Sequence, residues 1–265
     1  MNIRRLICSL FSFSILFCST VNAQNNANVQ LCYEDQDYPP YLIGTGRKPV
    51  MPNPGVLVEL TKSAFEDAGF TVSFIRRPWK RCMHMVGDNK AVGMFGVIYL
   101  PEREVFGYYP MHNNAPDKER RLLSVDYPVF VNVDAPVKWD GHTFADKKIH
   151  LGTPLGYATV TELENVHHLS PNQSYLPQDG LEAVSLNKLD GYIVERNVGE
   201  QLLLKHKLQK SVVAQEPPFK SHDLYLLLSH GFYDENTEKA EKIWSRLAIL
   251  RKTVLDDLMK SYLKR

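Results

Sequence analysis

Short apolar runs alternate with amphipathic segments along most of the chain, which predicts strands and helices in turn. The runs at 29–34 and 91–98 have the length of buried strands, and the second carries no charge. Between them, the segment 54–69 has apolar residues at helical spacing and ends at Gly69, a common helix stop. Strands that alternate with helices in this way predict an α/β protein.

The same alternation continues to the end of the chain. We expect the following further strands and helices: strands at 70–75, 126–134, 148–154, 191–195 and 223–229, and helices that begin at Trp79, after Gly156 and over 180–188. A long amphipathic C-terminal helix is expected from about Asn236, a residue type that often caps helices.

Two polar stretches, 112–121 and 214–222, divide these elements into two series. Each series is long enough to form its own α/β lobe. We therefore expect residues 24–112 and 217–265 to form lobe 1 and residues 113–216 to form lobe 2. The chain would pass from one lobe to the other twice, which makes a two-segment hinge.

The first 23 residues have the pattern of a secretory signal peptide. Arg4 and Arg5 precede an apolar run over 6–18, and a small-x-small end follows at 21–23. The run is shorter than the roughly 20 apolar residues that a transmembrane helix needs. We expect a mature protein that begins near Gln24 and is exported to the periplasm.

Charge and composition narrow the classes of function. Loss of Arg4 and Arg5 with the signal peptide changes the formal net charge from +1 to −1. A nearly neutral chain is not typical of a nucleic-acid-binding protein. With 44% hydrophobic residues, the chain can bury one large core or two smaller ones.

Two of the four cysteines, Cys32 and Cys82, remain after signal-peptide removal. An oxidising compartment favours a disulfide between them, and two buried free thiols are the alternative. Cys82 belongs to the group "RCMHM", which also suggests a soft-metal site. However, on a helix His84 points roughly 160° away from Cys82, so one ion could not bind both. We expect no metal and no cofactor.

Several segments together resemble a known family. In order, "CYEDQDYPPY", Gly55 before a helix, "RPWKRC", "YLPERE" and "LNKLDGYIVE" resemble the extracytoplasmic solute-binding proteins of polar amino-acid ABC transporters. The resemblance covers about residues 29–263. It implies the two-lobe, type II periplasmic-binding-protein fold, in which each lobe is a mixed sheet flanked by helices and the lobes close on a ligand.

The resemblance also implies where a ligand's charges bind. Arg103 stands where the family has the arginine that holds the ligand carboxylate, a group that a planar guanidinium pairs with well. Glu195 stands where the family has an aspartate for the ligand ammonium. The alternatives are a surface Arg103 paired with a neighbouring glutamate, and a Glu195 in a structural salt bridge with Arg196 or a lysine.

Further positions match ligand contacts of the family. Tyr38 corresponds to the aromatic residue that covers the ligand, and Asp35 to a position that reaches its side chain. Tyr38 could instead be a loop aromatic residue that packs against the prolines next to it. Trp79 is expected at the mouth of the cleft or in the core. Gly96, Ile98 and Tyr157 stand where hydroxyl residues usually bind the carboxylate, so backbone N–H groups would replace them.

The sequence thus predicts a monomeric periplasmic protein that captures an amino acid or a related zwitterion and delivers it to a membrane permease. One alternative is a ligand sensor that reports to a separate membrane receptor. Another is an enzyme on the same scaffold, because a few periplasmic dehydratases that act on cyclohexadienyl acids resemble this family. Such an enzyme would need a carboxylate clamp and a general acid, for which Glu195 or a histidine is available.

Overall fold

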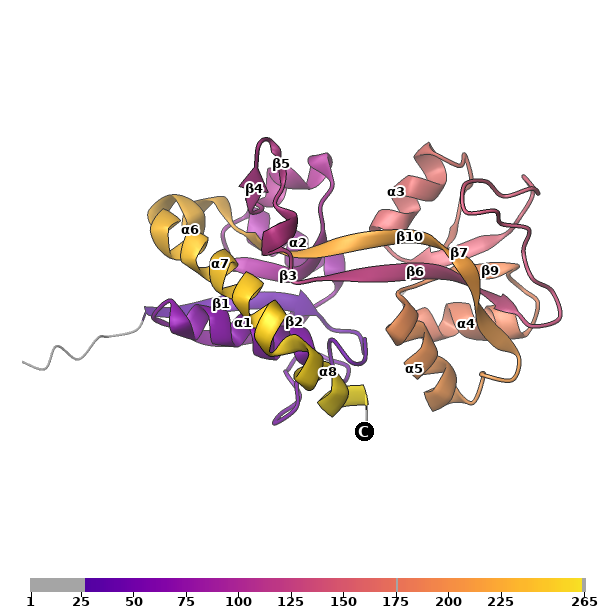
Figure 1. Cartoon of the computed structure of the whole chain (residues 1–265), viewed down its shortest axis with the longest axis horizontal. Coiled ribbons are helices and arrows are strands. Elements are labelled where there is room, and N and C mark those ends of the chain that lie inside the picture. Colours follow the sequence, from indigo (N-terminus) through magenta and orange to yellow (C-terminus); the bar gives the residue numbers. More distant parts are fainter. Residues whose placement is uncertain (1–26, 175, 264–265) are drawn as a thin grey trace, which may run out of the picture.

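The computed structural model describes residues 27–174 and 176–263 and shows a two-lobe α/β molecule (Figure 1). The predicted signal peptide, residues 1–23, lies outside the described residues. Eight strands form one mixed sheet in the order β2-β1-β3-β10-β6-β9-β7-β8. The predicted fold class is confirmed.

Lobe 1 is built on three parallel strands and the helices that cover them. Its first elements are β1 (Ala27–Glu34), α1 (Val56–Asp67), β2 (Phe70–Arg77), α2 (Trp79–Gly87) and β3 (Gly93–Ile98). A 3₁₀ helix, η1 (Pro101–Phe106), follows β3. After it come a hairpin of two short strands, β4 (Met111–His112) and β5 (Ala115–Pro116), and a second 3₁₀ helix, η2 (Lys118–Arg120).

Helix α1 illustrates how the apolar pattern positions these elements. The predicted stripe from Val56 to Ala68 is buried against the sheet, as expected. Gly55 precedes the helix at φ 118°, and a Cβ at this position would lie 2.2 Å from the backbone oxygen of Tyr41. A glycine is therefore required where the loop after β1 passes close to the start of α1.

Lobe 2 repeats the α/β pattern on a smaller scale. It contains β7 (Leu151–Pro154), α3 (Ala158–Asn165), β8 (Asn172–Ser174), α4 (Pro177–Ser185), β9 (Gly191–Ile193) and α5 (Arg196–His206). Helix α5 was not predicted. This helix begins shortly after the end of β9. Glu195 caps it by accepting a hydrogen bond from the Val198 N–H.

Two long antiparallel strands, β6 (Leu123–Asn132) and β10 (Val212–Leu228), connect the lobes (Figure 1). Residues 214–222, which were expected to connect the lobes, belong to β10. Pro217 and Pro218 within them cannot donate hydrogen bonds to a sheet. The structure accommodates both prolines at a shift in the β6–β10 register between Gln215 and Lys220.

The C-terminal segment returns to lobe 1 as three helices: α6 (His230–Glu235), α7 (Thr237–Thr253) and α8 (Leu255–Leu263). A single long helix was expected from Asn236. That residue does precede α7, although its side chain makes no capping hydrogen bond, and the helix breaks at Val254. Helix α7 packs on α1. Across the described ranges, no helix is both long and apolar enough to span a membrane.

The predicted disulfide between Cys32 and Cys82 is confirmed, with a Cα–Cα distance of 5.4 Å. It connects β1 to α2 inside a small apolar cluster that also contains Met83, Met94 and Leu227. This cluster lies on the face of the lobe 1 sheet that α2 covers.

We expect this disulfide to contribute about 4 kcal/mol to stability, because it closes a 50-residue separation in the unfolded chain. Urea unfolding of the mature protein, with and without reductant, measures this contribution. The double variant Cys32→Ser/Cys82→Ser should match the reduced protein and be insensitive to reductant. Equal stability in both redox states would contradict the prediction.

Candidate functional site

One buried arginine holds the loop that follows β1. The guanidinium of Arg76, which is 0% exposed, donates hydrogen bonds to the backbone oxygens of Glu34, Gln36, Ile43 and Gly44 at 3.1, 2.8, 3.0 and 2.5 Å. Because a buried guanidinium is costly unless its donors are satisfied, these bonds fix the loop conformation. The loop in turn positions Glu34 and Tyr38 at the carboxyl end of β1.

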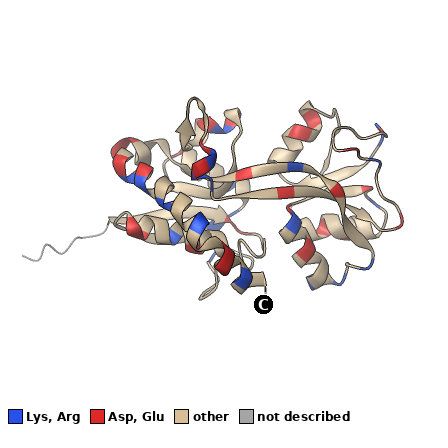
Figure 2. Ribbon diagram, in the orientation of Figure 1, with Lys and Arg blue, Asp and Glu red and all other residues tan. Residues whose placement is uncertain are grey.

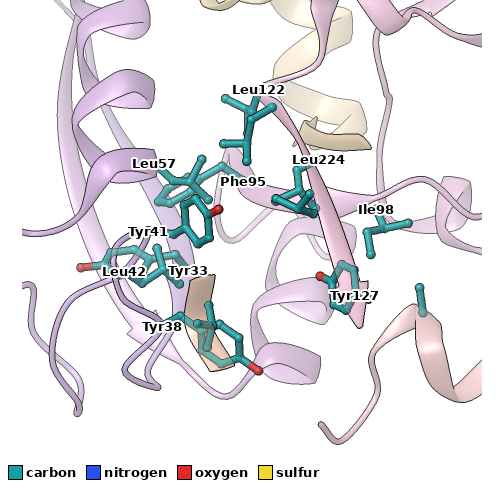
Figure 3. Packing of buried hydrophobic residues seen from close by; sticks show 14 of the residues in the cluster. Tyr33, Tyr38, Tyr41, Leu42, Leu57, Phe95, Ile98, Leu122, Tyr127 and Leu224 are labelled. Atoms are coloured by element: carbon teal, nitrogen blue, oxygen red, sulfur yellow. The ribbon is translucent and has the colours of Figure 1, made fainter. Parts of the chain in front are cut away.

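A cavity of about 50 Å³ lies between the lobes. Six aromatic side chains line it: Tyr38, Tyr41, Trp79, Phe95, Tyr127 and Tyr157. Figure 3 shows Tyr38, Tyr41 and Tyr127, which come from the loop after β1 and from β6. Two carboxylates also line the cavity, Glu34 from lobe 1 and Glu195 from lobe 2. The cavity therefore combines aromatic walls with acidic groups at the carboxyl ends of strands, where open α/β sheets bind ligands.

Tyr157, at the start of α3 in lobe 2, contacts lobe 1 across the cleft. Its hydroxyl donates a hydrogen bond of 2.5 Å to the Glu34 carboxylate. Its ring stacks on Tyr38 at 5.8 Å between centroids and contacts Trp79 at 5.6 Å. Burial raises the pKa of the Tyr157 hydroxyl well above its ordinary value, so it remains a donor at neutral pH. Lobe 2 thus contacts three side chains of lobe 1 through one residue.

Glu195 follows β9 and is 4% exposed. Besides the Val198 N–H at 2.9 Å, its carboxylate accepts hydrogen bonds from the Tyr41 hydroxyl at 3.2 Å and the Asn197 amide at 3.1 Å. The alternative partner, Arg196, instead pairs with Glu216 at 2.6 Å. The donors around Glu195 are all neutral.

Arg103 lies in η1 and is 8% exposed. Its guanidinium donates to the backbone oxygens of Ile98 at 2.9 Å and Gly156 at 3.3 Å, and lies 5.7 Å from the centroid of the Trp79 ring. A second cavity of about 10 Å³ reaches Arg103. Four residues line both cavities: Trp79, Gly96, Tyr127 and Tyr157. The two cavities form one cleft with an acidic end and an arginine end.

Burial raises the pKa of both acidic groups. The carboxyls of Glu34 and Glu195 each have a pKa of about 7, mainly because burial disfavours the charged form. Hydrogen bonds from Tyr157 and Val198, respectively, partly oppose this effect. Both groups therefore titrate near neutral pH, in contrast with exposed carboxyls.

The structure brings together most of the residues predicted for the site. Those that line the two cavities are Tyr38, Trp79, Gly96, Ile98, Arg103, Tyr157 and Glu195. Asp35 is not among the described residues that line them, and its carboxylate accepts a hydrogen bond from Gln36 at 3.2 Å. The ligand-binding roles of all eight residues remain predictions.

Three polar residues of the site were missed from the sequence, namely Glu34, Tyr41 and Tyr127. Glu34 could have been noticed as the acidic residue that ends β1, since strand ends of this kind line ligand clefts. Tyr127 had no signal, because it lies inside a strand. Thr159, the hydroxyl residue nearest the start of α3, is buried against Thr153 within lobe 2 and does not reach the cleft.

Metal chemistry receives no support from the described part of the chain. No group of three or more His, Cys, Asp and Glu side chains there is arranged to hold a metal ion. The charged groups of the cleft are the two carboxylates and one guanidinium.

We expect Glu34→Gln to stabilise the protein relative to wild type more at pH 8 than at pH 5. The pKa of Glu34 is raised from 4.5 to about 7 in the folded state, so the wild type loses stability as the pH rises from about 4.5 through 7, whereas the glutamine variant does not. The shift corresponds to a difference of roughly 3 kcal/mol at most. Urea unfolding at both pH values measures it, with the exposed Glu235→Gln as the matched control. A difference that is independent of pH would contradict this.

Comparison with known proteins places this geometry in context. No protein-family model matches the sequence, and no curated protein matches it. Solved structures do match. A histidine kinase sensor domain with similarity to periplasmic binding proteins is 18% identical, with a TM-score of 0.69 over 90% of this chain and 96% of that one.

Two further structures have the same architecture. The substrate-binding protein of an amino acid ABC transporter is 12% identical, with a TM-score of 0.66, and the match covers 90% of this chain and all of that one. An ancestral amino-acid-binding protein described as a precursor of cyclohexadienyl dehydratase is 13% identical, with a TM-score of 0.62 over 89% and 95% of the two chains. The chain therefore has the two-lobe fold of periplasmic amino-acid-binding proteins.

Proposed function

We propose that the protein is a periplasmic solute-binding protein that captures a small zwitterion between its two lobes. The observation that carries this proposal is one cleft with carboxylates at one end and a guanidinium at the other. A bound zwitterion would place its ammonium group near Glu195 and its carboxylate near Arg103. Both pairings would be charge-assisted and largely shielded from water.

Binding requires the lobes to separate. The cavity of about 50 Å³ is far smaller than the roughly 300 Å³ or more of a typical small-molecule site. Opening about the paired strands β6 and β10 would release the Tyr157 ring from Tyr38 and Trp79. Closure on a ligand would then restore contacts between the lobes, such as the ion pair of Lys205 with Asp37 at 2.6 Å.

Two kinds of partner fit this role. Delivery to an ABC permease is our first proposal, and it agrees with the likeness to the binding protein of an amino acid ABC transporter. A sensor that reports to a separate membrane receptor is the alternative, supported by the likeness to a kinase sensor domain. Both depend on the same event, closure around a solute, so ligand binding is the first property to measure.

A dehydratase is a further candidate because Glu195 has a pKa of about 7, within the range of a general acid. His222 does not support this candidate. Burial lowers the pKa of its imidazole to about 4, so it is neutral at pH 7 and is no charged proton donor.

We expect no turnover of cyclohexadienyl acids such as prephenate and arogenate. The measurement is the absorbance of the substrate during incubation with the protein. Turnover that is lost in Glu195→Gln would instead establish the enzyme.

We expect Arg103→Ala to weaken binding of a zwitterionic ligand by at least about 30-fold, equivalent to ~2 kcal/mol, because the carboxylate loses its buried partner. The measurement is a thermal-shift screen of residues 24–265 against amino acids and small carboxylates, followed by calorimetry of any hit. Arg246→Ala, on the exposed face of α7, is the matched control and should bind like wild type.

Either of two results would count against this proposal. If no amino acid or small carboxylate shifts the melting temperature, the capture of zwitterions is wrong. If a zwitterion binds but Arg103→Ala retains its affinity, the carboxylate is held elsewhere and the assigned orientation is wrong.

A further inference from the structure

The acidic end of the cleft contains more negative charge than a single ammonium group would balance. Glu34 and Glu195 line the same cavity and are 7% and 4% exposed. Within the described residues, neither carboxylate has a lysine, arginine or histidine at ion-pair distance. A buried charge without a counter-ion is costly, so a cationic group is the natural partner of each.

Arg76 lies near Glu34 and slightly favours its charged form, but it makes no ion pair with the carboxylate. Its guanidinium donates to four backbone oxygens, including that of Glu34 itself, and faces the ring of Tyr33 at 5.0 Å. The Glu34 side chain instead accepts from the neutral hydroxyl of Tyr157. Its charge therefore remains available to a ligand that displaces Tyr157.

The two acids come from opposite lobes, and this couples ligand charge to closure. Glu34 ends β1 in lobe 1, and Glu195 caps α5 in lobe 2. Closure brings the two carboxylates to the same cavity, which like charges oppose unless a cation or a proton compensates them. Figure 2 shows acidic and basic residues interspersed on the helices of both lobes, so the excess of acid is a local property of the cleft.

The walls of this end also suit a cation. The rings of Tyr38, Tyr41, Trp79, Tyr127 and Tyr157 line it. Aromatic faces attract ammonium and guanidinium groups through their quadrupole, and the attraction is stronger away from water. Among the described residues that line the cleft, Arg103 supplies the single positive charge, and it lies at the other end, where the second cavity begins.

We propose that Glu34 is a ligand-binding residue and that, together with Glu195, it selects solutes with a net positive charge. The ligand carries a second cationic nitrogen, which Glu34 binds, while Glu195 binds the α-ammonium group and Arg103 the carboxylate. Two carboxylates and one guanidinium are then matched by two cations and one anion. This inference rests on the proposed function, which requires only that a zwitterion is captured.

Matched sets of ligands test the inference on the wild-type protein by calorimetry. The first set is cationic amino acids: lysine, ornithine and arginine. The second set replaces the side-chain cation with a neutral group: norleucine, norvaline and citrulline. The third set lacks the carboxylate: cadaverine, putrescine and agmatine. We expect at least one cationic amino acid to bind at least 10-fold more tightly than its neutral counterpart.

Variants then test the assigned residue. Glu34→Gln should weaken binding of the cationic ligand by about 10- to 100-fold, the range for loss of one charge-assisted partner, and should reduce the preference for the cationic ligand over its neutral counterpart by a similar factor. Glu235→Gln, on the exposed surface of α6, is the control and should bind both like wild type. The wild-type comparison of ligands does not depend on whether Glu34→Gln folds.

The outcomes separate this inference from the proposed function. Equal or tighter binding of a neutral amino acid than of its cationic counterpart overturns the inference and leaves the capture of zwitterions intact. Equal binding of a cationic amino acid and its decarboxylated counterpart supports the charge selection and overturns the role of Arg103. No binding of any compound in the three sets overturns the inference. Unchanged affinity for the cationic ligand in Glu34→Gln also overturns it.

Discussion

The antiparallel pairing of β6 and β10 is the constraint on which the rest of the molecule depends. These strands run from the sheet of one lobe into the sheet of the other, so they fix which strand ends face each other. Lobe 1 presents the end of β1 and the loop after it, whereas lobe 2 presents the residues that follow β7 and β9. One apolar cluster runs through both lobes, but the cleft chemistry exists only where both lobes contribute.

The cleft is built from chain segments whose local structures are ordinary. Glu195 is a helix cap, Tyr157 precedes a helix, and Arg103 lies in a 3₁₀ turn. Each also reaches across or towards the other lobe, through Tyr41, Glu34 and Gly156, respectively. One set of hydrogen bonds therefore serves both the local fold and the contact between lobes. Residues of this kind cannot be assigned to structure or to function alone.

The elements that depend on local pattern could be predicted from the sequence. The stripe of α1 and the uncharged run of β3 were predicted because burial of one face requires them. The strand over 214–222 was not, because two prolines locally favour a loop and only its pairing with β6 makes it a strand. Helix α5 was missed because its cap, Glu195, was assigned to the end of the preceding strand.

The residues of the site divide in the same way, into those that could be predicted from the sequence and those whose place depends on tertiary structure. Arg103, Glu195, Tyr38 and Trp79 were predicted through a resemblance of segments, which records their order along the chain. Glu34 and Tyr127 were missed because their position in the cleft depends on how two distant strands face each other. Tyr157 was predicted for the backbone N–H groups near it, whereas in the structure its side chain contacts Glu34 and Tyr38 across the cleft. The direction of a side chain depends on tertiary packing, which one sequence does not reveal.

The bonds of Arg76 have a consequence for the kinetics of capture. Since this guanidinium already holds the loop at four backbone oxygens, the lobe 1 half of the site is ordered before a solute arrives. An incoming solute then meets a preformed surface, and little conformational entropy remains to be lost in that loop. The association rate would be governed by how often the lobes stand apart, and the residence time by how firmly they meet.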